Sequence, residues 1–272
     1  MTQVKVQLDR AMETSLVTLY GKALDARMTP SILHDQAAVD ALSKIEYDFS
    51  RLKTMNERVA PNAAARSKHF DDWTREFLAA QPSATVVHLA CGLDTRVWRV
   101  DPGPSVAWFD VDFPDVIAVR RKLFPEREGY RMIPSSVTDA GWLEAIPLDR
   151  PVFLVAEGLT MYLSPADGHV LFRRIIDRFG HGTFAFDTHN RLGVRLVNIM
   201  LKRSFGRAML DWAVNSRADI DRIDPRLHCV DAISALLAPS SRQLQLSTRL
   251  FTQLVRPFPA LRDLGLYFRY TF

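Results

Sequence analysis

The sequence predicts a doubly wound, mostly parallel α/β sheet in a single domain, on the strength of three observations. Five short β-like runs recur at the spacing of alternating strands and helices. Three of these runs are apolar until a polar end, as strands buried on both faces of a parallel sheet are. Helical segments lie between the runs, and a chain of 272 residues can bury a core of this size.

The expected elements follow the chain in order. A helical cap at residues 1–80 precedes a core at 81–190, and helices with the last strands fill 191–272. The strands are expected at 85–89, 107–112, 131–135, 152–157 and 183–188, with the last ones at 243–247 and 265–272. The cap helices are expected at 8–27, 35–45 and 68–80, and the core helices at 114–123 and 165–178, both of which begin with proline.

Composition narrows the class of protein. An apolar fraction of 47% and a charged fraction of 24% are ordinary for a globular domain. Cys91 and Cys229 form no disulfide framework and lack the spacing of metal ligands. No apolar run approaches the roughly 18 residues that span a bilayer, and the first ten residues lack a signal-peptide pattern. We therefore expect a cytoplasmic protein without metal and without a membrane partner.

The positive charge of the chain is concentrated in its last third. Residues 191–272 hold 13 basic and 6 acidic side chains, whereas the whole chain has a net charge of only +4. This distribution indicates either a solvated basic surface or a field that attracts an acidic substrate or an acidic carrier protein. No Arg/Lys stripe interleaved with aromatic residues is present, so we expect no nucleic-acid partner.

Polar residues at the strand ends are the candidate site, because open α/β sheets bind ligands beyond the carboxyl ends of their strands. Gly92 follows the first strand and allows close approach of the backbone to a ligand. Asp112 stands 20 residues later, the spacing of an acid that meets ribose hydroxyls, although it could instead cap the next helix. Glu157 follows five apolar residues, where packing alone does not explain a carboxylate.

Three motifs carry a family resemblance. HLACGLDTR (88–96), FDVDFP (109–114) and AEGLTMYL (156–163) occur in the order and spacing of the leucine carboxyl methyltransferase family. The chain resembles most its bacterial polyketide O-methyltransferases of the tetracenomycin type, from about residue 18 to residue 189. The resemblance implies a Rossmann-like class I methyltransferase fold, S-adenosylmethionine as cofactor and a small-molecule methyl acceptor.

The resemblance also implies roles for individual residues. Arg66 matches the family arginine that holds the carboxylate of the cofactor, a task that suits a guanidinium. Asp112 matches the ribose-binding acid, and Glu157 matches the acid of the AEG motif. Lys22 aligns loosely with a lysine near the family's site.

The chain departs from the family pattern at two of the cofactor positions. Ala90 replaces the first glycine of the G-x-G turn that ends at Gly92, which narrows the room beside the cofactor. Ser136 and Val137 stand where relatives have an Asp-Leu pair at the adenine, so a hydroxyl or the backbone replaces the acid there. Neither change removes a charge that methyl transfer needs.

The acceptor is expected to be a carboxylate of an anionic small molecule such as a polyketide-type natural product. A carboxylate is ionised at pH 7 and needs no general base, whereas a phenol, the alternative acceptor, benefits from one. His189 is the best candidate base and Tyr162 a candidate on the substrate side. The simpler interpretations are a hydrogen-bonded loop histidine and a packed tyrosine, so no catalytic residue is assured.

Two other classes of protein compete with this interpretation. A dinucleotide oxidoreductase would share the sheet and the ribose acid, but its G-x-G-x-x-G turn is absent. The second alternative is a binding protein without catalytic activity or cofactor. Only Ala90, which narrows the room beside the cofactor, favours it. The sequence leaves the oligomeric state open.

Overall fold

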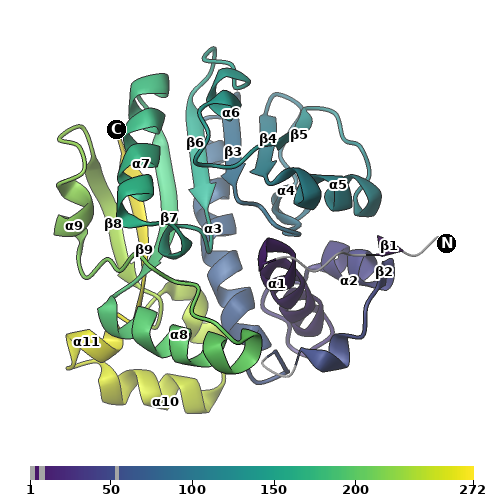
Figure 1. The fold of residues 1–272 in the computed structure, drawn as a ribbon, viewed down its shortest axis with the longest axis vertical. Coiled ribbons are helices and arrows are strands. Elements are labelled where there is room, and N and C mark those ends of the chain that lie inside the picture. The colour runs from purple at the N-terminus through teal and green to yellow at the C-terminus, as the bar shows by residue number, and fades with distance from the viewer. Residues whose placement is uncertain (1–3, 6–9, 53–54) are drawn as a thin grey trace.

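A seven-stranded sheet forms the centre of the protein (Figure 1). The computed structural model describes residues 4–5, 10–52 and 55–272. Its strand order is β5-β4-β3-β6-β7-β9-β8. The strands are β3 (Thr85–Leu89), β4 (Ala107–Asp112), β5 (Tyr130–Pro134), β6 (Val152–Ala156), β7 (Thr183–His189), β8 (His228–Ser234) and β9 (Gly265–Thr271).

The five strands from β3 to β7 pair in parallel, and β9 runs antiparallel to both β7 and β8. The predicted doubly wound, mostly parallel sheet is therefore confirmed. The order reverses at β3, since β4 lies on one side of it and β6 on the other. Ligands of doubly wound sheets bind at such a reversal, beyond the carboxyl ends of the strands.

The five helices predicted by range are present to within a few residues, except at one start. The helices of the described residues are α1 (Arg10–Ala26), α2 (Gln36–Ser43), α3 (Ala60–Ala80), α4 (Arg96–Val100), α5 (Pro114–Leu123), α6 (Gly141–Glu144), α7 (Pro165–Phe179), α8 (Arg191–Phe205), α9 (Arg217–Asp221), α10 (Leu246–Val255) and α11 (Pro259–Arg262). Residues 8 and 9 of the first predicted helix lie outside the described residues. α3 begins at Ala60, eight residues before the predicted start, because Pro61 and the alanines after it favour a helix.

Near the C-terminus one predicted strand is wrong and one observed strand was not predicted. Residues 243–247 form no strand: a 3-10 helix (η3, Pro239–Gln243) ends there and α10 begins at Leu246. Leu244 and Leu246 alternate as in a strand, but Leu246, Leu250 and Leu254 recur at intervals of four, which is helical spacing. β8 was not predicted, because its partner β9 is distant in sequence and its own apolar pattern is weak.

Helices cover both faces of the sheet. On β3, Val87 and Leu89 face a core with Leu171 and Phe172 of α7, whereas Val86 faces the other core, which includes α3. This alternation explains why the strand is apolar on both faces. In Figure 1, α7 lies before the sheet and α3 behind it, and the cap helices α1 and α2 lie near the ends of β3 and β4.

Two further sequence predictions concern membrane-spanning segments and disulfide bonds. Among the described residues, no helix has the length and apolar character needed to cross a membrane. A minor two-stranded parallel sheet pairs β1 (Val4–Lys5) with β2 (Ile45–Glu46). Cys91 and Cys229 are both free thiols, as expected.

Candidate functional site

Two adjoining cavities open at the carboxyl ends of the central strands. The small cavity has a volume of about 320 Å³ and the large cavity about 520 Å³. Both are lined by Thr14 and Ser15 of α1, by Ala90 after β3, and by Gly158 and Tyr162 after β6. The N-terminal cap therefore forms part of the wall of both cavities.

Asp112 lies at the end of β4 in the wall of the large cavity. Its carboxylate accepts a hydrogen bond from the backbone N–H of Gly92 at 2.6 Å and one from that of Phe113 at 2.7 Å. Burial raises the pKa of Asp112 to about 6, although both amide hydrogen bonds act to lower it. The carboxylate thus joins the ends of β3 and β4.

Ser136 and Val137 line the same cavity, beyond the end of β5. The Ser136 hydroxyl lies 2.8 Å from the Thr138 hydroxyl. Val137 is buried, and its carbonyl oxygen accepts a hydrogen bond from the Trp142 indole at 3.2 Å. This part of the wall therefore offers hydroxyls and an apolar side chain but no carboxylate.

The turn after β3 has an unusual backbone. Ala90 and Gly92 have φ angles of +49° and +52°, in the left-handed region that favours glycine. A Cβ on Gly92 would lie 2.7 Å from the Ser15 hydroxyl of α1, so a side chain there would also require Ser15 to shift. Ala90 adopts this conformation despite its methyl group, at a cost of about 1–2 kcal/mol.

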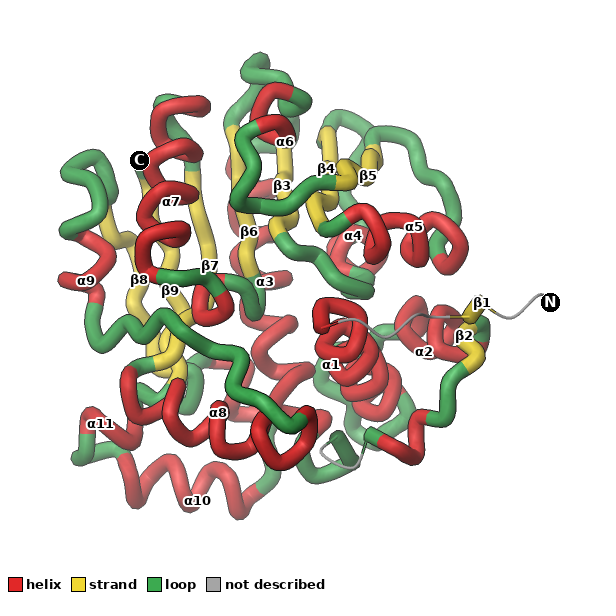
Figure 2. Tube along the Cα trace, viewed as in Figure 1, coloured by secondary structure: helices red, strands yellow, loops and turns green. Residues whose placement is uncertain are grey.

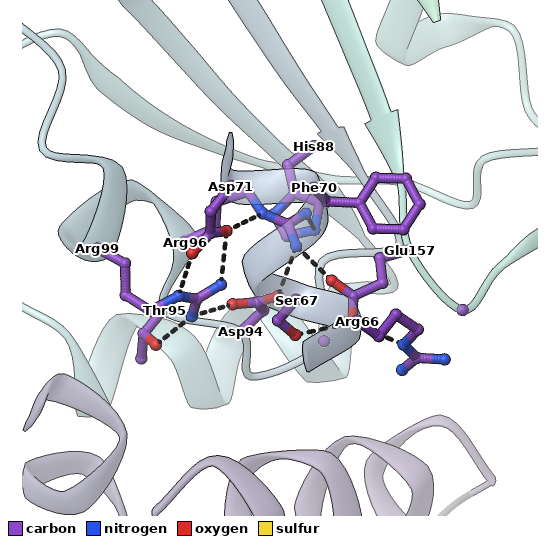
Figure 3. Close-up of polar contacts among 12 residues, drawn as sticks. Arg66, Ser67, Phe70, Asp71, His88, Asp94, Thr95, Arg96, Arg99 and Glu157 are labelled. Atoms are coloured by element: carbon purple, nitrogen blue, oxygen red, sulfur yellow. Dashed lines mark hydrogen bonds and ion pairs between the residues drawn. The ribbon is translucent and has the colours of Figure 1, made fainter. Parts of the chain in front are cut away.

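Arg66 and Glu157 meet at the small cavity (Figure 3). The Arg66 Nε donates to Glu157 Oε1 at 2.9 Å, and Arg66 Nη1 lies 3.3 Å from Asp187 Oδ2. Ser67 donates a further hydrogen bond to Glu157 at 2.9 Å. Burial alone would raise the pKa of Glu157, but the positive charges of Arg66 and Lys22 hold it at about 2. Glu157 is therefore ionised and paired.

A buried ion-pair network continues from Glu157 into the protein (Figure 3). Arg96 is fully buried and pairs with Glu157 and, at 2.8 Å, with Asp71 of α3. Arg99 lies 2.7 Å from both Asp71 and Asp94. Because each guanidinium has several carboxylate partners, the network is largely compensated, which is what allows these charges to be buried.

The network ties the cap to the core. Lys22 of α1 pairs with Asp94 at 2.7 Å, and Arg99 pairs with Asp35, the N-cap residue of α2, at 2.9 Å. Lys22 lines the small cavity, as the loose alignment implied for a lysine near the site. The other members were missed, although Asp94 and Arg96 belong to the motif after the first strand.

His189 and Tyr162 both line the small cavity. His189 ends β7, its Nδ1 lies 3.1 Å from the carbonyl oxygen of Leu264, and burial lowers its pKa. Tyr162 ends a 3-10 helix (η2, Thr160–Tyr162), is 39% exposed, and has a pKa raised by its surroundings, burial above all. Most of the remaining wall is apolar and includes Val17, Met161, Val197, Met200, Leu201 and Leu210.

The structure brings all the predicted site residues to these two cavities. They are Lys22, Arg66, Ala90, Gly92, Asp112, Ser136, Val137, Glu157, Tyr162 and His189. Asp187 was missed, although it is a polar residue near the end of β7 and the criterion applied to Glu157 would have found it. It accepts a hydrogen bond from the N–H of Gly158 at 2.6 Å and contacts Arg66. Within the described ranges, no group of three His, Cys, Asp or Glu residues is placed to hold a metal ion.

Comparison with known proteins identifies relatives over the whole chain. The leucine carboxyl methyltransferase family profile matches residues 15–176. The chain is 38% identical, over 98% of both sequences, to the tetracenomycin polyketide synthesis O-methyltransferase TcmP of Streptomyces glaucescens. It is 33% identical, over 82% of both, to an S-adenosyl-L-methionine-dependent methyltransferase of Gibberella zeae.

Solved structures support the fold. A candidate methyltransferase of Thermobifida fusca superposes with a TM-score of 0.58 at 16% identity, covering 92% of this chain and 93% of that one. Magnesium protoporphyrin IX methyltransferase of Synechocystis, solved with S-adenosylhomocysteine, superposes with a TM-score of 0.51 at 8% identity, covering 82% and 93%. The predicted class I methyltransferase fold is confirmed.

The predicted family, cofactor and type of reaction are confirmed by the same relatives. The family profile covers more than half of the chain, and the two relatives are 38% and 33% identical to it over 98% and 82% of its length. The chain belongs to the leucine carboxyl methyltransferase family and is an S-adenosylmethionine-dependent O-methyltransferase.

Proposed function

We propose that the protein methylates an oxygen of a small molecule, with adenosine in the large cavity and the methionine part and methyl acceptor in the small cavity. The observation that carries this proposal is the position of two charged residues. Asp112 lies in the wall of the large cavity and Arg66 in that of the small one, with Ala90 in the wall of both. This is the distribution of polar groups that a nucleoside joined to an amino acid requires.

Asp112 is suited to hold the ribose. Each of its oxygens accepts one backbone hydrogen bond, from Gly92 or Phe113, and keeps further lone pairs for hydroxyl donors. The amides fix the carboxylate in place before the ligand binds. Ser136 and Val137 complete this end, with the hydroxyl or backbone as polar contact for adenine and the valine as apolar contact.

Arg66 is suited to hold the methionine carboxylate. Its guanidinium uses Nε and Nη1 for Glu157 and Asp187, and it has five N–H donors in all. Glu157, which stays ionised, provides the opposite charge for the methionine ammonium group. The residues present therefore fit both charged ends of the amino acid.

We propose a carboxylate as the acceptor. S-adenosylmethionine supplies a methyl group on a sulfonium, and the protein must place an oxygen nucleophile in line with it and exclude water. The apolar residues in the wall of the small cavity disfavour water, and the Tyr162 hydroxyl, whose pKa is raised above an ordinary value near 10, is protonated at pH 7 and can donate a hydrogen bond to the acceptor. An anionic acceptor is ionised at pH 7 and needs no base.

One observation favours a phenolic hydroxyl as the second candidate. The carbonyl oxygen of Leu264 can only accept a hydrogen bond, so Nδ1 of His189 carries the proton when the two are bonded. Nε2 is then the unprotonated nitrogen, and the lowered pKa keeps the ring neutral at pH 7. A neutral imidazole in this cavity is a competent base for a hydroxyl acceptor.

His189→Ala separates the two acceptors, with His181→Ala, an exposed histidine outside the cavities, as the matched control. For a carboxylate acceptor, turnover should fall little, because positioning rather than proton removal limits the reaction. For a phenol with His189 as base, turnover should fall about 10²–10⁴-fold. The product is an independent readout: mild alkali cleaves a methyl ester but not an aryl methyl ether, so an alkali-stable product contradicts the carboxylate proposal.

A further inference from the structure

Helices α8, α10 and α11 form one edge of the molecule, away from the strands β3 to β5 (Figure 2). α10 contacts α11, and the Asn190 side chain at the start of α8 donates to the carbonyl oxygen of Ala260 in α11 at 3.0 Å. These three helices and their junction hold nine of the sixteen exposed large apolar side chains of the described residues. They are Leu196, Ile199, Met200, Leu246, Leu250, Phe251, Leu254, Phe258 and Leu261.

α10 carries the most exposed of these side chains. Leu246, Leu250 and Leu254 are 67%, 61% and 72% exposed, and they recur at intervals of four residues. Residues four apart lie on the same side of a helix, so the three leucines form a row along α10. Thr252 and Val255 face the interior instead. An exposed apolar row of this kind marks an interaction site, because a partner that covers it removes apolar surface from water.

The same edge carries an excess of positive charge. Neither residues 191–210 nor residues 232–262 include an aspartate or glutamate, and together they hold nine basic residues. Within the described chain, seven exposed members make no ion pair with a carboxylate: Arg191, Arg195, Lys202, Arg203, Arg242, Arg249 and Arg256. We call these nine apolar and seven basic side chains the basic apolar face.

The combination of positive charge and exposed apolar surface indicates which kind of partner this face can bind. A twofold contact with a second copy would place the same cations against one another, with no acidic residue in these segments to compensate. An acidic protein matches the charge, but a row of leucines this exposed is not needed for an electrostatic contact. An anionic lipid surface matches both, since leucine and phenylalanine enter its apolar layer while arginine and lysine meet the headgroups.

We propose that the basic apolar face binds the surface of an anionic lipid bilayer. The helices lie on the surface and do not cross it, in agreement with the absence of a spanning helix among the described residues. This proposal replaces the expectation of no membrane partner, which considered only spanning segments. It depends on the exposed side chains of α8 and α10 and not on the identity of the methyl acceptor.

The face also borders the acceptor side of the site. Met200 is 49% exposed and lines the small cavity, and Val197 and Leu201 of the same helix line it as well. A protein bound through this face therefore has the wall of its acceptor cavity next to the lipid. An apolar acceptor dissolved in the bilayer would have a short path to the site.

The test is co-sedimentation of the full chain with vesicles of phosphatidylcholine alone or with about 30% phosphatidylglycerol. We expect binding to the anionic vesicles only, decreasing as salt screens the charges. The double variant Arg249→Gln/Arg256→Gln should bind more than tenfold more weakly, since each cation near an anionic surface contributes about fivefold. Leu250→Ser/Leu254→Ser should also weaken binding while methyl transfer to a soluble acceptor is unchanged.

Two controls match these variants. Arg121→Gln/Lys122→Gln removes the same charge from exposed positions on α5, at the other end of the sheet, and Leu148→Ser removes an exposed leucine from a loop. Both should bind as the unaltered chain does. Equal loss in the controls, or binding independent of phosphatidylglycerol, would overturn the proposal. So would a solution dimer that Leu250→Ser/Leu254→Ser dissociates, or binding to polyglutamate without binding to vesicles.

Discussion

Asp112 connects two strands and, in our proposal, the cofactor ribose. Asp112→Ala should weaken cofactor binding more than it alters the fold, because charge-assisted hydrogen bonds to hydroxyls are lost from a preformed site. The loss is about 1.5–3 kcal/mol per hydrogen bond, measured as the dissociation constant by calorimetry. Asp115→Ala, an exposed acid in the first turn of α5, is the control. An unchanged dissociation constant in Asp112→Ala removes the ribose assignment.

The raised pKa of Asp112 predicts how cofactor affinity depends on pH. Ribose hydroxyls donate to the ionised carboxylate, so cofactor affinity should be constant above pH 6 and fall as the pH drops through about 6. One unit below the pKa the loss should be about tenfold, because only about a tenth of the groups are ionised.

The contribution of Asp112 to folding has the opposite sign. Its folded pKa lies above the ordinary value of 3.8, so the ionised form opposes folding, and this cost disappears as the pH falls from about 6 to 4. Asp112→Asn is the control for the predicted pH dependence of cofactor affinity. If this variant still loses affinity as the pH falls, a group other than Asp112 causes the loss.

At the scale of elements, α7 packs unusually closely against the segment after α8. A Cβ on Gly168 would lie 2.1 Å from the buried indole of Trp212. Gly168→Ala should therefore destabilise the protein by about 1–3 kcal/mol, as overpacking does, measured as the free energy of unfolding in denaturant. Gly141→Ala in α6, where a Cβ meets nothing within 4 Å, should be neutral. Equal stability of the two variants would show that Trp212 moves freely.

Elements with a local signal were predicted and those without one were not. The continuous apolar runs of β3 and β6 and the proline starts of α5 and α7 give these elements to within a residue. β8 depends on pairing with β9, which is more than thirty residues away, so no local window predicts it.

The residues of the candidate site were likewise predicted only in part. Its strand-end residues, such as Asp112 and Glu157, were predicted because strand ends share one edge of a sheet. The partners of Glu157 within the network were not, because Arg96 and Asp71 lie on helices whose packing the sequence does not reveal. Local motifs thus locate the site, whereas tertiary packing determines which charged side chains pair with its residues.

At the scale of the whole molecule, the ligand should stabilise the fold. A cofactor that contacts the cap and the core binds the folded chain only, so at about 100 times its dissociation constant it adds about 2.7 kcal/mol. For a chain of this size that is a rise of about 5–10 °C in the melting temperature. The rise should persist in excess chelator and be absent with NAD. A strict requirement for a divalent ion would contradict the assigned site.

The contact between Ser15 and the turn at Gly92 has a kinetic consequence. α1 lies against the turn with no room for a Cβ, and it lines both cavities. We therefore predict that a ligand as long as the two cavities together leaves when α1 moves, and Lys22 ties that helix to Asp94. Departure of S-adenosylhomocysteine, rather than methyl transfer, should set the steady-state rate. Rapid quenching should record an initial burst of about one methylated product per enzyme, and Lys22→Met should shorten the delay that follows it.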